Sequence, residues 1–139
     1  MENRRQTYRH PFEPKEVLRA ELRRSEDDPV LACEVLDLSL GGARVRLRKQ
    51  VGPLNVGDAF VIRLLGRGAP APVQLNLSIP SQIVFVAQYD KEWHCGLRFL
   101  PSADVRVNDH VEQTLSRFLL AEQRRRKEAA NRRSYTGHG

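Results

Sequence analysis

The residues near the start of this sequence that could bind a ligand are three closely spaced arginines. Arg5 and Arg9 stand four residues apart, and Arg4 precedes them directly. A guanidinium offers a planar fork of donors that fits phosphate oxygens or the O6/N7 edge of guanine, and its face stacks on a base. Pro11 and Pro14 exclude a continuous helix, so the arginines belong to an extended arm that could grip a compact anion. Taken alone, the pattern is more typical of a solvated basic tail.

A short turn between two strand-like runs provides the second candidate group. Residues 37–42 read DLSLGG, in which Asp and Ser side chains can bond to turn backbone and glycine permits positive φ or close backbone approach. In a functional interpretation, the Asp37 carboxylate accepts from the N1 and N2 donors of a guanine. Ser39 then donates to a phosphate, and Gly42 leaves the surface open. Taken singly, a purely structural turn is the better supported interpretation.

Short strand-like runs separated by turn residues position these groups. Residues 43–48 alternate aliphatic side chains with arginines, a period of two that separates them onto opposite faces of a strand. The runs are Lys15–Leu22, Pro29–Leu38, Ala43–Arg48, Ala59–Leu65, Val73–Ile79, Ile83–Tyr89 and Trp93–Phe99. Six or seven short strands at this spacing predict an antiparallel all-β barrel or sandwich and not βαβ units.

The chain changes character at about residue 104, where apolar side chains recur at helical spacing. These side chains are Val107, Val111, Leu115, Phe118 and Leu119. Asp109 and Glu112 give a weak capping-box signal near the start of the helix, whose apolar stripe should pack on the barrel. We therefore expect an arm at 1–14, a barrel at 15–103, a helix at 104–130 and a flexible tail at 131–139.

The net charge of +6 on 139 residues is concentrated at one end of the chain. Residues 117–139 carry seven basic and two acidic side chains, whereas the remainder carries sixteen basic and fifteen acidic ones. The predicted barrel is therefore nearly neutral, unlike most electrostatic nucleic-acid binders. The basic helix end is more typical of a solvated terminus than of a partner or membrane-surface contact.

Length, cysteine content and the start of the chain limit the remaining classes. The length suits one domain, and no apolar stretch approaches the roughly 18 residues of a membrane span. Residues 1–12 lack a secretory signal, so we expect a cytoplasmic protein. Cys33 and Cys95 are then expected to be buried thiols and not a disulfide.

Catalytic and metal-binding patterns are missing from the sequence. It contains no glycine-rich phosphate loop, no Gly-x-Ser-x-Gly elbow and no His-Glu-x-x-His pair, and its four histidines are scattered. We expect a binding protein without a metal and not an enzyme.

The two candidate groups together resemble the motifs of the PilZ domain family. Arg5 and Arg9 fit its Arg-x-x-x-Arg motif, and Asp37, Ser39 and Gly42 fit its Asp-x-Ser-x-x-Gly motif with Gly41 as a typical flank. Residues 96–99 are similar to its closing strand, and residues 115–126 to its C-terminal helix. The resemblance covers roughly residues 3 to 127.

The resemblance implies a six-stranded antiparallel PilZ-type β-barrel with a C-terminal helix, a bacterial receptor for the second messenger cyclic di-GMP. Arg5 and Arg9 are then expected to contact its phosphates and guanines, opposite Asp37 and Ser39. Two guanines and two negative charges suit charge-assisted arginine bonds and stacking. Arg4 favours two mutually stacked ligands per chain over one. Ligand capture would order the arm and signal to a downstream protein partner, in a process such as motility or biofilm formation.

Two further residues are weaker candidates for ligand contacts. Arg46, predicted to point outward, could reach a phosphate. Phe85 could offer a stacking face, although a core position is the more typical role for it. Two functional alternatives stay open: a nucleotide-independent scaffold for pilus or motility machinery, and a small RNA- or single-stranded-DNA-binding barrel that uses the basic tail.

Overall fold

The strands of the chain close into a barrel to which one further strand and a long helix are added. The computed structural model describes residues 9–12, 18–48, 53–66 and 75–136. The strands are β1 (His10–Pro11), β2 (Leu18–Arg23), β3 (Leu31–Leu38), β4 (Gly42–Arg48), β5 (Ala59–Gly66), β6 (Leu77–Gln88) and β7 (Glu92–Phe99). The helix, α2, spans Val105–Thr136. These elements confirm the predicted fold class.

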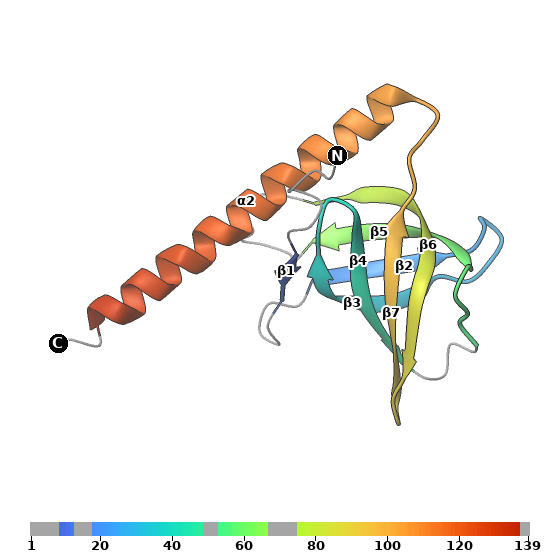
Figure 1. The fold of residues 1–139 in the computed structure, drawn as a ribbon, viewed down its shortest axis with the longest axis horizontal. Helices are drawn as coiled ribbons and strands as arrows, with labels where there is room; N and C mark the ends of the chain where they lie inside the picture. Colours follow the sequence, from blue (N-terminus) through green and yellow to red (C-terminus); the bar gives the residue numbers. More distant parts are fainter. Residues whose placement is uncertain (1–8, 13–17, 49–52, 67–74, 137–139) are drawn as a thin grey trace.

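All strand pairings are antiparallel, and their order shows how the barrel closes. The sheet runs β1-β3-β2-β5-β6-β7-β4, and an additional pairing of β3 with β4 closes six of these strands into a ring. β1 stands outside the ring, paired to β3. Figure 1 shows β1 between the barrel and α2.

Alternation of side chains within each strand produces the core. In β5 the pattern of exposed and buried residues is strict, with Phe60, Ile62 and Leu64 inside. Burial of each such side chain contributes roughly 1.5–3 kcal/mol. Leu115, Phe118 and Leu119 of α2 join the same core cluster and Val111 packs against it, as predicted, whereas Val107 of the predicted stripe is 45% exposed.

Two boundaries differ from the expectation. Residues 77–79 and 83–88 of the two predicted strands belong to one strand, β6, in which Pro80 stands opposite Val61 and does not end the strand. Residues 73 and 74 of the first predicted strand lie outside the described residues. A bulge between Ile83 and Phe85 bends β6 further along. The helix also continues to Thr136, past residue 130, where the sequence predicted a flexible tail.

The helix begins one turn earlier than its predicted capping signal. Asp104 Oδ1 accepts a hydrogen bond from the Arg106 backbone N–H at 2.9 Å, which caps the helix start. Asp109 and Glu112 lie inside the helix. The capping box predicted from them was therefore wrong. The C-terminal end of α2 projects past the barrel (Figure 1). No helix in the described ranges is long and apolar enough to cross a membrane.

The two cysteines lie inside the barrel as free, buried thiols, as predicted. Burial raises the pKa of the Cys33 thiol to about 12. Burial likewise raises the pKa of the Cys95 thiol to about 11. Both groups are therefore protonated and unreactive at neutral pH.

Candidate functional site

The base of the N-terminal arm lies directly against the strand that leads into the predicted turn. In the β1–β3 pair, His10 stands opposite Leu38 and Pro11 opposite Asp37. Arg9 therefore enters beside the end of β3, and its Nη1 donates to Asp37 Oδ1 at 3.1 Å. The fold thus brings together two predicted site residues that are 28 positions apart in the chain.

The Arg9–Asp37 pair is accessible from one side. The Arg9 side chain is 60% exposed, whereas the Asp37 side chain is 16% exposed. An ion pair with one exposed partner contributes little to stability, typically about 0–1 kcal/mol. The guanidinium and the carboxylate can therefore exchange this contact for stronger ones to a ligand.

Ser39 shapes the turn from inside. Ser39 is 2% exposed. Its Oγ accepts from the backbone N–H of Gly41 at 3.3 Å and of Gly42 at 3.2 Å, and it donates to the Gly42 carbonyl. A phosphate contact of Ser39, as predicted, would require the hydroxyl hydrogen to leave that carbonyl.

Gly42 is required by packing, for a reason that the sequence did not give. A Cβ built on Gly42 would lie 2.1 Å from the Leu97 carbonyl oxygen, so any side chain would displace the backbone of β7. Gly41 is half-buried, and its carbonyl accepts from the Phe99 N–H at 2.9 Å. The two glycines therefore fix the turn to the closing strand.

A row of residues crosses the sheet from Asp37 over four strands. Asp37 stands opposite Arg44 on β4, Arg44 opposite Gly96 on β7, and Gly96 opposite Phe85 on β6. Since neighbouring strands lie about 4.8 Å apart, Gly96 is about 10 Å from Asp37. Arg44 is exposed, and Gly96 has no side chain that would separate Arg44 from Phe85.

Phe85 is exposed at the end of this row. It is 47% exposed, so the core position considered more typical for it in the sequence was wrong. The bulge after Ile83 turns Phe85 outward. A Cβ at Gly96 would lie 3.3 Å from the Phe85 Cβ, which is closer than usual, so a side chain there would make Phe85 shift slightly. Phe85 can therefore offer an aromatic face to a base.

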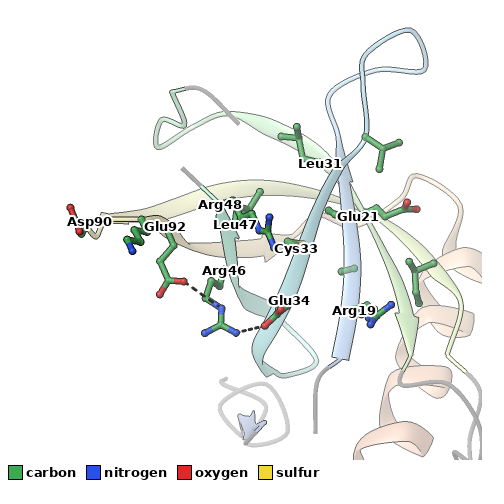
Figure 2. Close-up of a pocket in the computed structure, with 15 residues that line it drawn as sticks. Arg19, Glu21, Leu31, Cys33, Glu34, Arg46, Leu47, Arg48, Asp90 and Glu92 are labelled. Atoms are coloured by element: carbon green, nitrogen blue, oxygen red, sulfur yellow. Dashed lines mark hydrogen bonds and ion pairs between the residues drawn. The ribbon is translucent and has the colours of Figure 1, made fainter. Parts of the chain in front are cut away.

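Arg46 is held by carboxylates on both sides. Figure 2 shows its guanidinium between Glu34 of β3 and Glu92 of β7. It donates to Glu34, and its Nε lies 3.6 Å from Glu92 Oε2. Hydrogen bonding to Glu34 raises the pKa of the guanidinium. Arg46 is thus engaged in a structural network that lines a wide groove, and this groove contains neither Arg9 nor Asp37.

Two predicted ligand contacts, Arg4 and Arg5, lie outside the described residues. Within residues 9–12, 18–48, 53–66 and 75–136, no group of three His, Cys, Asp or Glu side chains could hold a metal ion.

The sequence did not indicate the positions of Arg44 and His10 relative to the candidate site. The alternation of residues 43–48 places Arg44 on the outer face of its strand, but only the strand register shows that it stands opposite Asp37. His10 is one of the four scattered histidines of the sequence, yet it is 1% exposed and lies in the base of the arm. No pattern in the sequence indicated that position.

Comparisons with known proteins agree with this geometry. The profile described as PilZ domain matches residues 3–121. No curated protein matches the chain. Among solved structures, the PilZ domain of YcgR from Escherichia coli with c-di-GMP superposes with a TM-score of 0.68 at 20% identity, covering 93% of this chain and 98% of that one.

Two longer proteins share the same fold. The YcgR complex with c-di-GMP from Escherichia coli gives a TM-score of 0.69 at 22% identity over 93% of this chain and 50% of that one. The MrkH–c-di-GMP complex of K. pneumonia gives 0.59 at 13% identity over 84% and 52%. The chain thus spans about half the length of these two proteins. With a family profile that matches most of its length and a barrel of the same topology, the chain belongs to the PilZ domain family.

Proposed function

We propose that this chain is a receptor for cyclic di-GMP, which binds on the outer face of the barrel between the N-terminal arm and the row from Asp37 to Phe85. The observation that carries the proposal is the contact of Arg9 with Asp37, across 28 positions of sequence, at an accessible edge of the sheet. The structures of YcgR and MrkH that share this fold are described as complexes with c-di-GMP.

Each group in the proposed site has a partner on the ligand. Arg9, with Arg5 of the same arm, supplies forks for the phosphates or the guanine edges. Asp37, released from Arg9 or shared with it, accepts from guanine N1 and N2. Phe85 offers a face on which the second base can stack, and Arg44 adds positive charge between the two.

The functional output is binding and not catalysis. Capture of the ligand draws the arm onto the barrel, and the ordered arm presents a changed surface to a downstream protein. Arg4 supplies a third guanidinium, so we propose that two stacked ligand molecules occupy the site. Arg46 contributes less, because a ligand would have to separate it from Glu34 and Glu92.

Calorimetric titration with two cyclic dinucleotides tests the proposal. Cyclic di-GMP should bind at micromolar or lower concentration, with two ligands per chain. Cyclic di-AMP has the same charge but lacks the N1–H and N2 donors that face Asp37, so it should bind at least about tenfold more weakly. No heat from cyclic di-GMP would refute the proposal and favour a nucleotide-independent scaffold. Equal affinity for both dinucleotides would refute guanine recognition by Asp37.

A further inference from the structure

The base of the arm is enclosed between two elements. On one side β1 pairs with β3, and the Phe12 N–H donates to the Leu36 carbonyl at 2.8 Å. On the other side lies α2 (Figure 1). Residues 10–12 therefore contact both the strand that bears Asp37 and the C-terminal helix.

Polar groups of α2 contact the arm at two points. Arg126 donates from Nη2 to the Pro11 carbonyl, 115 positions away in sequence. His10 Nε2 lies 4.0 Å from Glu122 Oε2, and both side chains are 1% exposed. Arg125 holds the same carboxylate at 3.0 Å, which fixes its orientation. A carboxylate is this deeply buried only where such partners compensate its lost hydration.

An aromatic chain links the same segments through the core. The His10 and Phe12 rings meet edge to face with centroids 4.9 Å apart. Phe12 in turn lies 6.5 Å from Phe118, which is 1% exposed and packs with Leu115 in the core cluster. The arm base is thus held by apolar and polar groups of one helix.

We propose that α2 is the positioning element of the ligand site: Arg126 and Glu122 hold residues 10–12 against β3, so that Arg9 faces Asp37. This inference rests on the proposed function. A coupling free energy between two sites is reciprocal. Cyclic di-GMP, by holding Arg9, must therefore tighten the docking of α2 on the barrel to the same extent that docked α2 favours cyclic di-GMP.

The consequence is a route from the ligand to a distant surface. An arm whose base is already ordered loses less conformational entropy when it captures a ligand. Without the contact of Arg126 with Pro11, the arm must lose more conformational entropy when the ligand binds, so the affinity falls. Ligand binding then makes the docked part of α2 more stable. The end of the helix that projects past the barrel is continuous with that part, so it can carry the change to a partner.

The test compares Arg126→Ala with Arg124→Ala in the full chain. Both substitutions remove one positive charge from the same helix, and Arg124 is exposed. Arg126→Ala should weaken cyclic di-GMP binding on the order of fivefold, at the lower end of typical coupling factors. Arg124→Ala should bind like the wild type, and Arg126→Lys, which keeps a donor, should recover part of the affinity.

Hydrogen exchange supplies a readout that a merely structural role would not change. In the wild type, cyclic di-GMP should slow amide exchange in residues 105–122, and this slowing should shrink in Arg126→Ala while thermal stability stays close to wild type. Equal affinities of the two alanine variants, with equal ligand-induced protection, would overturn the coupling and leave the proposed function intact. Absence of cyclic di-GMP binding to the wild type would instead overturn the proposed function itself.

Discussion

The outer surface of β3 carries two arginine–carboxylate contacts that differ in how fully each guanidinium is engaged. Among the described residues, Arg9, at the base of the arm, contacts one carboxylate, that of Asp37 on β3. Arg46 meets two, Glu34 and Glu92, from strands on either side of its own. The first contact joins an added strand to the barrel, and the second joins strands within the barrel.

The difference shows which of two similar contacts can serve a ligand. Arg46 lies between the carboxylates of Glu34 and Glu92, and their negative charges repel a phosphate, although the ion pairs themselves contribute little to stability. Separating Arg9 from Asp37 frees one donor fork and one acceptor, which are the complementary groups that a guanine dinucleotide needs. The proposed site therefore differs from the Arg46 network in the incomplete engagement of its groups and not in their type.

The largest effect is expected at the glycine that supports the site without touching the ligand. Gly42→Ala would place a Cβ against the Leu97 carbonyl, so it should destabilise the fold by about 3 kcal/mol, the upper range for overpacking. Denaturant unfolding measures this loss. Gly57→Ala is the control for a strained but spacious position, since nothing lies within 4 Å of its Cβ. Equal stability of Gly42→Ala and the wild type would contradict the packing argument.

Asp37→Asn should have the next largest effect, on ligand affinity. The amide keeps the size of the side chain but directs N–H donors at the guanine donors and removes a charge, so binding should weaken about thirtyfold, as for a lost charged hydrogen bond. Calorimetry measures this change. The variant should also lose selectivity for cyclic di-GMP over cyclic di-AMP, and unchanged selectivity would exclude Asp37 as the guanine acceptor.

Phe85→Leu separates stacking from simple burial. Leucine keeps an apolar side chain at a half-exposed position, so stability should hardly change, whereas loss of the aromatic face should weaken binding about tenfold. Val84→Leu, at the neighbouring exposed position of the same bulge, is the matched control. Wild-type affinity in Phe85→Leu would show that no base stacks there.

Arg46→Gln should have the smallest effect of the series. Arg46 and its partners are each more than a third exposed, so the network contributes at most about 1 kcal/mol to stability. The unfolding temperature of the variant should be slightly lower than that of the wild type. This difference should be smaller at high salt, which screens the ion pairs. A large loss of ligand affinity would break the comparison, because it would show that the engaged arginine also binds.

The fold and half of the site were predictable because both depend on local patterns. Alternation in residues 43–48 and 59–65 follows directly from burial on one face of a strand. The resemblance to the PilZ motifs predicted that Arg9 and Asp37 lie together, and the structure places them in contact. The two runs on either side of Pro80 were expected as separate strands, yet Pro80 pairs with Val61 inside β6.

What could not be predicted depends on contacts between distant segments. The outward turn of Phe85 follows from a bulge that no residue type announces. The engagement of Arg46 requires strand register, which sets Glu34 directly opposite it. The contact of Arg126 with Pro11 spans most of the chain and depends on where α2 crosses the barrel.

The central claim is tested most directly by titrating cyclic di-GMP into the wild type, Arg9→Ala and Arg46→Ala side by side. Both variants lose one guanidinium from an arginine–carboxylate contact on β3. We predict clear binding by the wild type, a loss of about 100-fold in Arg9→Ala, and a change of less than about threefold in Arg46→Ala. Equal losses in the two variants, or binding unaffected by Arg9→Ala, would contradict the account.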